Sequence, residues 1–195
     1  MADSKVLKQV EKLRREHPPL TYKKDAIERL ALAEGRAYFN RLGLHYNLFV
    51  RAKMPKDSVL ARALDEKLER SVDRIYRLLG LLYPWKDVAA ARQAIEHGHA
   101  RARAGALEYL DNVLSSQQRS RLIPVLEDAP IEAKVRRGNV ILKTRPRDVE
   151  ETLLELINDD DQVVAAAAID LVGINQLWAL RDDIEHVLSH RDVSD

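Results

Sequence analysis

Apolar residues recur at three- and four-residue spacing along most of this chain, which is the period of an amphipathic α-helix. Strand-like alternation of Val, Ile and Thr is nearly absent, and glycine and proline number only seven each. The first run spans residues 4–16 and ends before Pro18 and Pro19, because proline cannot continue a helix. Its apolar positions are Val6, Leu7, Val10 and Leu13. The pattern predicts an all-α fold.

Two longer helices are predicted next. One covers residues 22–54 and stops before Pro55; the other runs to Leu82 and stops before Pro84. Two glycines are the expected places for a bend in the first of these helices: Gly35 and Gly43. Two residues are candidate N-caps of the second: Asp57 and Ser58. We expect residues 1–84 to form a three-helix N-terminal extension or cap.

The second half of the chain, residues 85–195, contains one apolar pattern four times at a fixed period of 31 residues. The copies are Ala91, Ala94 and Ile95; Leu122, Val125 and Leu126; Leu153, Leu156 and Ile157; and Ile184, Val187 and Leu188. A period of this length is typical of helical-repeat proteins. Small residues between the copies, such as Ala104 and Ala166, let paired helices approach closely. We therefore expect helical hairpins that stack on one another.

The segment from Leu153 to Gly173 resembles a HEAT repeat of the short bacterial kind found in phycobilisome-lyase-like proteins. In that family an apolar first helix ends in acidic residues, here Asp159 to Asp161, and an alanine-rich second helix begins with a valine, here Val163. The resemblance implies a right-handed α-solenoid of HEAT-like hairpins, an armadillo-type fold, over residues 85–195.

Two parts of this repeat region depart from the pattern. Over residues 130–146, Gly138, Asn139 and Pro146 replace the alanine-rich helix, so a short helix followed by a loop is expected. The last copy has its first helix and almost no second before Asp195. An incomplete repeat of this kind suggests a clipped end or a domain of a longer protein.

A second resemblance concerns Ile75 to Pro84 together with Ala106 to Leu114. These segments are similar to the helical region of large bacterial proteins that carry a membrane domain related to the ATP/ADP translocases of the major facilitator superfamily. Some of those proteins also carry a cyclic-nucleotide-binding module. The resemblance implies the cytoplasmic helical part of a transporter-like protein, and it brings no transport or nucleotide-binding residue with it.

Composition narrows the range of functions. The absence of cysteine excludes disulfides, thiolate metal sites and cysteine nucleophiles, and it fits a reducing, cytoplasmic location. The longest apolar stretches, Leu78 to Trp85 and Ala165 to Ile174, are shorter than a membrane-spanning helix. We therefore expect a membrane association only through a covalently linked domain.

No catalytic, cofactor or metal site is predicted, and we expect a protein that is not an enzyme. The motifs GxxxxGK[ST], GxGxxG and GxSxG are missing. His97 and His99 have no further ligands nearby in sequence, and His186 and His190 lack the glutamate of an HExxH motif. The three aspartates from Asp159 to Asp161 are expected to end one helix and cap the next.

Charge is distributed unevenly along the chain. Residues 1–145 hold 29 Lys and Arg against 18 Asp and Glu, whereas residues 146–195 hold 3 against 13. The basic run through the middle of the repeats comprises Arg101, Arg103, Arg119, Arg121, Lys134, Arg136, Arg137, Lys143 and Arg145. Four of these are the candidate interaction surface: Arg101, Arg103, Arg136 and Arg137. Solvated helix faces are the alternative reading of the same charges.

The predicted function is non-catalytic protein–protein interaction or scaffolding by the stacked helices, with a protein partner or an adjacent domain of a longer chain. The alternative is nucleic-acid binding by the basic central surface, since some DNA glycosylases that act on alkylated purines are also built from HEAT-like repeats. Binding of anionic lipid is a third function that such a basic surface can serve. Uncapped end faces of a solenoid are also expected to favour dimerisation.

Overall fold

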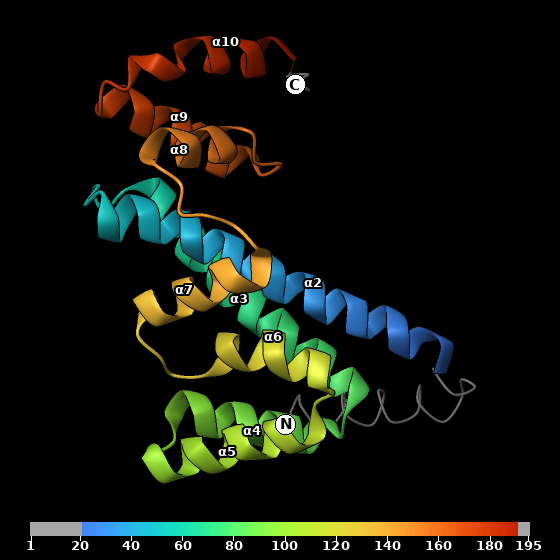
Figure 1. Ribbon diagram of the computed structural model, residues 1–195. Coiled ribbons are helices and arrows are strands. Elements are labelled where there is room, and N and C mark those ends of the chain that lie inside the picture. Colours follow the sequence, from blue (N-terminus) through green and yellow to red (C-terminus); the bar gives the residue numbers. More distant parts are fainter. Residues whose placement is uncertain (1–20, 191–195) are drawn as a thin grey trace, which may run out of the picture.

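The computed structural model describes residues 21–190, and every regular element in that range is a helix (Figure 1). The α-helices are α2 (Thr21–His45), α3 (Val59–Leu82), α4 (Trp85–His97), α5 (Ala100–Val113), α6 (Ser116–Leu126), α7 (Ile131–Leu142), α8 (Val149–Ile157), α9 (Gln162–Ile174) and α10 (Arg181–His190). A π-helix, η1 (Tyr46–Arg51), continues α2, and a 3₁₀ turn, η2 (Trp178–Leu180), precedes α10. The all-α prediction is confirmed, and the helix expected over residues 4–16 lies outside the described residues.

The two longest helices, α2 and α3, form an antiparallel hairpin. Ser58 caps α3 as expected, because its Oγ accepts a hydrogen bond from the backbone N–H of Ala61 at 3.2 Å. Neither Gly35 nor Gly43 interrupts α2; the change of helix type occurs at Tyr46, where the backbone widens into η1. No helix within residues 21–190 is both long and apolar enough to cross a membrane.

The segment from α2 to α3 contributes buried residues to two hydrophobic cores. The first contains buried residues of α2, α3 and α4 to α7, among them Phe39, Leu79, Leu110 and Leu122. The second contains buried residues of η1, the start of α3 and the elements from α8 to α10, among them Leu48, Leu64, Leu156 and Leu171. The hairpin therefore belongs to the interior of the molecule.

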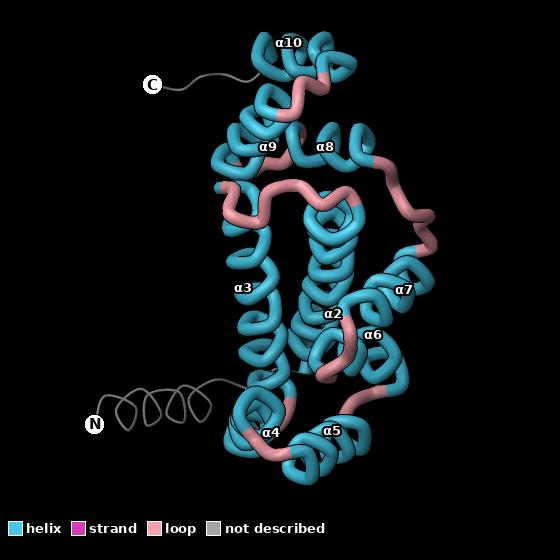
Figure 2. The backbone as a smooth tube through the Cα atoms, turned by 90° about the vertical axis from the view of Figure 1, so that its left-hand side faces the viewer, coloured by secondary structure: helices cyan, strands magenta, loops and turns pink. Residues whose placement is uncertain are grey.

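Figure 1 shows the α2–α3 hairpin between α6–α7 on one side and α8–α9 on the other. Figure 2, turned by 90°, shows α2 and α3 side by side, with α4–α5 at one end and α8–α10 at the other. Residues 1–84 were expected to form an N-terminal extension or cap; in the described part of that range, the α2–α3 hairpin lies between two groups of later helices. The physical reason is that α2 buries one side against α3 and another against α6 and α7.

The 31-residue pattern falls on α4, α6, α8 and α10. Its apolar positions in α6 and α8 are all at most 5% exposed. In α10 only Val187 is buried, while Leu188 is 56% exposed. The pattern thus predicts the helices and their buried faces well where a neighbouring helix covers them.

The irregular segment is more regular than the glycine and asparagine suggested. Helix α7 runs for 12 residues, through Gly138 and Asn139, and only residues 143–148 form a loop. Lys143 ends the helix in the left-handed conformation, with φ of 56°. Gly138 is tolerated because it is buried against the Phe39 ring, where a larger residue has no room. The loop expected after the helix is present, whereas the helix before it is regular and not short.

Candidate functional site

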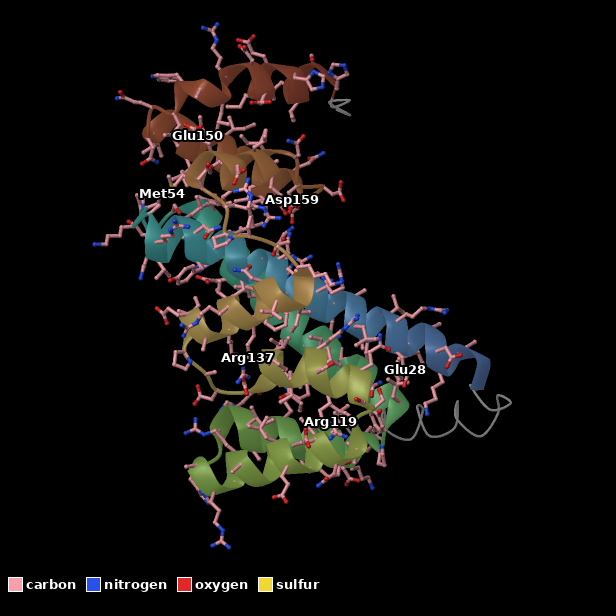
Figure 3. All side chains as sticks on the ribbon, in the orientation of Figure 1. Glu28, Met54, Arg119, Arg137, Glu150 and Asp159 are labelled. Atoms are coloured by element: carbon pink, nitrogen blue, oxygen red, sulfur yellow. The ribbon has the colours of Figure 1, made fainter. Side chains whose placement is uncertain are left out.

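The four candidate arginines divide into two groups. Arg103 of α5 and Arg137 of α7 both point to the connection between α6 and α7. There each forms an ion pair with one of two adjacent acidic residues. The Arg103 guanidinium is 2.9 Å from Asp128 Oδ2. Arg137, which is labelled in Figure 3, pairs with Glu127. Their positive charge is thus locally compensated. Arg101 and Arg136 are exposed and have no hydrogen bond or ion pair to the rest of the described chain.

Arg136 lines a cleft of about 340 Å³ between η1, α7 and the loop at residues 143–148. We call it the arginine cleft. Its walls carry four arginines and one carboxylate. The lining residues are Gly43, Tyr46, Asn47, Arg51, Glu132, Val135, Arg136, Asn139, Arg145, Pro146 and Arg147. Arg101 and Arg103 are absent from this lining, so the structure does not gather the four predicted residues into one site.

Two arginines of the cleft are held by glutamates of α8. Arg145 forms a two-pronged contact with Glu151, and Arg147 Nη2 lies 2.9 Å from Glu155 Oε2. Arg147 also donates to Asn40 Oδ1 at 3.3 Å, and Asn40 Nδ2 donates to Glu155 at 2.6 Å. This network fixes the wall formed by the loop and connects α8 to α2.

The other two arginines, Arg51 and Arg136, come from η1 and α7. Both are exposed, and neither has a carboxylate partner among the described residues. A guanidinium group offers five N–H donors in a planar fork that matches carboxylate and phosphate oxygens. Two unpaired guanidinium groups in one cleft therefore form an anion-binding arrangement.

The π-helix shapes one wall of the cleft. Its wider turn is closed by a hydrogen bond from Ala52 N to Asn47 O at 2.9 Å. Asn47 is buried, and its Nδ2 donates to the Thr152 hydroxyl at 3.4 Å. Thr152 donates in turn to Asp148 O at 2.6 Å. The wall that carries Arg51 is thus tied to α8, and π-helical turns often occur at functional sites.

The polar residues that line the cleft are mainly hydrogen-bond donors. Its lining contains no histidine, serine, threonine or cysteine to act as a nucleophile or as the base beside one. Its single carboxylate, Glu132, is exposed on the first turn of α7. The arrangement suits recognition of an anion.

The histidines and aspartates that the sequence offered as candidate metal-binding or catalytic groups lie at or beside helix ends and on α10. His99 is the N-cap of α5, where its Nδ1 accepts from Ala102 N at 3.3 Å. His186 and His190 stack with ring centroids 4.2 Å apart on α10. Asp161 caps α9, as predicted for one of the three aspartates. Within residues 21–190, no three His, Cys, Asp or Glu side chains gather as a metal site would require.

Sequence reasoning missed part of the cleft. Arg51 and Arg147 lie outside the basic run, and Asn47 gives no sequence signal as a cleft residue. Arg145 and Arg136 were in the run, but linear clustering could not separate the paired arginine from the unpaired one. Folding brings the cleft together from two parts of the chain that are far apart, residues 43–51 and residues 132–147.

Comparison of the chain with protein families, with curated proteins and with solved structures finds no match in any of the three.

Proposed function

We propose that this chain is a non-catalytic scaffold that binds another protein, or an adjacent domain of a longer, transporter-like membrane protein, through a solenoid-like stack of HEAT-type hairpins. One observation carries the proposal: α9 presents apolar residues on a solvent-facing side as well as on its buried side. A helix that is apolar on both sides normally has neighbours on both sides.

The solvent-facing side of α9 carries an exposed apolar residue near each end, with the exposed Asp170 between them, and a third follows in the next turn. Val163 and Ile174 are 59% and 62% exposed. They are eleven residues apart, which places them within ~20° of each other around the helix axis. Trp178 follows in η2 and is 64% exposed. Exposed apolar patches mark interaction sites, and tryptophan is enriched among the residues that dominate binding energy.

Contacts with neighbouring helices hold the exposed side of α9 in a fixed position. Lys67 of α3 contacts Asp159 at 3.1 Å and Asp161 at 3.2 Å, which joins the α2–α3 hairpin to the α8–α9 turn. Asp159 is labelled in Figure 3. On its other side α9 packs into the second core through Val164, Ala168 and Leu171. Preorganised surfaces lose less conformational entropy on binding.

A photo-reactive amino acid placed at Trp178 tests this proposal in the producing cell. Val140 of α7, which is 78% exposed, is the matched control position. We expect one discrete cross-linked protein from position 178 and none from position 140. A cross-link to a second copy of the chain identifies self-association as the scaffold's contact. The same products from both positions would contradict the proposal.

Nucleic-acid binding is the second candidate, and the four arginines of the cleft favour it. It requires several phosphate contacts along an extended surface. Arg103 and Arg137 are engaged by Asp128 and Glu127, which weakens such a surface. A salt-sensitive mobility shift that disappears in Arg136→Glu but persists in Arg101→Glu would support it. An identical shift in both variants would remove the cleft from the interface.

A further inference from the structure

We propose that the arginine cleft binds a small ligand that carries a phosphate group, held by Arg51 and Arg136. This site is distinct from the apolar side of α9, so it extends the proposed scaffold function by a ligand-binding one. The cleft is bounded by η1, α7 and the loop at residues 143–148.

The charge of the cleft favours an anion. Four guanidinium groups and one carboxylate line it, which leaves a formal excess of positive charge. Arg145 and Arg147 have glutamate partners, so their charges are largely balanced. Arg51 and Arg136 have none among residues 21–190, and both line the same cleft, one from η1 and one from α7. Like charges that share a cleft repel each other, and a bound anion removes that repulsion.

The neutral groups of the lining favour a phosphate over a simple halide. Asn139 accepts a hydrogen bond from the Thr144 hydroxyl at 3.4 Å through its Oδ1, so its amide N–H groups remain as donors at the cleft. Arg51, Arg136 and Asn139 together offer directional donors from two elements. A phosphate has several acceptor oxygens and is matched by forked guanidinium donors.

The size of the cleft favours a small ligand. Its volume of about 340 Å³ is near the lower end of the range for small-molecule sites, which is roughly 300–1,000 Å³. Glu132 adds an acceptor to the lining. A ligand that combines one phosphate with hydroxyl groups uses both features, whereas a polyanionic strand places further negative charge beside Glu132.

Titration calorimetry of the full chain with glycerol phosphate, and separately with inorganic phosphate, tests this site. We expect saturable binding of one ligand per chain. Removing a charged bidentate donor is expected to weaken binding about tenfold or more, in Arg51→Ala and in Arg136→Ala alike. Arg101→Ala is the matched control, because Arg101 is also exposed and unpaired but lies outside the cleft. Its affinity should equal that of the parent.

The two probes distinguish the source of the phosphate. Stronger binding of glycerol phosphate identifies an organic phosphate, and equal binding identifies the free ion; either supports the site. Absence of saturable binding by both probes in chains whose helical circular dichroism is intact would overturn it. An equal loss of affinity in Arg101→Ala would also overturn it. So would binding of a single-stranded oligonucleotide that neither phosphate probe displaces.

Discussion

Gly138 of α7 lies against the ring of Phe39 in α2, so closely that a Cβ atom at position 138 would be 2.7 Å from Phe39 Cδ1. The contact sets how near α7 can come to the central hairpin. It also explains why a glycine is present in the middle of a regular helix, where it otherwise costs stability. The residue that suggested a broken helix in the sequence is a packing residue in the structure.

Gly138→Ala is expected to destabilise the protein by about 1–3 kcal/mol, because the added methyl group forces Phe39 or the α7 backbone to move. Gly105→Ala is the control, since nothing lies within 4 Å of a Cβ there. It should raise stability by up to about 1 kcal/mol. Urea unfolding followed by circular dichroism measures both. Equal effects of the two substitutions would show that α2 and α7 do not meet at this point.

Lys143 ends α7 in the left-handed conformation, with φ of 56°, which strains any residue that has a Cβ. Lys143→Gly is therefore expected to raise the free energy of unfolding by about 1 kcal/mol. Lys143→Ala keeps the Cβ and should bring no such gain. The same denaturant titrations compare the two variants, and a gain from alanine as large as that from glycine would rule out backbone strain as the cause.

Asp161 stabilises α9 in two separable ways. Its Oδ1 accepts from Val163 N at 2.9 Å, and its other carboxylate oxygen lies 3.2 Å from Lys67 Nζ. Asp161→Ala removes both contacts and should cost about 1 kcal/mol from the lost cap alone. Asp161→Asn keeps a capping oxygen and loses the charge, so it should cost less. A larger loss in the asparagine variant would contradict the assignment of the cap.

The Asp161 carboxylate also predicts an acid response. The hydrogen bond from Lys67 is the main cause that lowers the pKa of Asp161, with the backbone N–H groups of Val163 and Val164 adding to it. Because the folded pKa is below the unfolded one, this stabilisation is complete above about pH 4 and is lost as pH falls through the folded pKa. Thermal melts below pH 4 should show a smaller decrease in Asp161→Asn than in the parent. An identical decrease would exclude this contribution.

His45 predicts a second pH response at a higher pH. Burial is the main cause that lowers its pKa; Asp65, whose Oδ1 is 3.1 Å from His45 Nε2, opposes this, and Lys56 adds to it. Since the unfolded chain then binds the proton more readily, stability should fall as pH decreases below about 6.5 towards the folded pKa. His45→Gln should flatten this part of the melting-temperature profile. A melting-temperature profile of His45→Gln that matches the parent's over this range would contradict this role of His45.

The features that could be predicted from the sequence are those that depend on residues close together in the chain. Ser58 and Asp161 have the residue type and position of N-caps, and both cap helices. The apolar spacing in α6 and α8 identified their buried faces correctly. These features depend on helical periodicity and local hydrogen bonding, which a linear pattern contains.

Which helices pack together was not predictable in the same way. Periodicity shows which face of α2 is apolar but not which helices cover it, so the position of the hairpin between α6–α7 and α8–α9 was missed. The arginine cleft has the same origin, because Arg51 and Arg136 meet only after α2, η1 and α7 have packed. A basic run in the sequence does not show which guanidinium groups find carboxylates.

The most direct test of the scaffold proposal is the affinity between this chain and the protein that cross-links to it at position 178. Surface plasmon resonance would compare the parent with Ile174→Lys and Trp178→Ala, and with Val140→Lys as the control on another exposed apolar position. The account predicts at least about a tenfold loss of affinity in the first two variants and none in the control, as expected for residues at the centre of an interface. Unchanged affinity in both α9-side variants, or an equal loss in Val140→Lys, would contradict it.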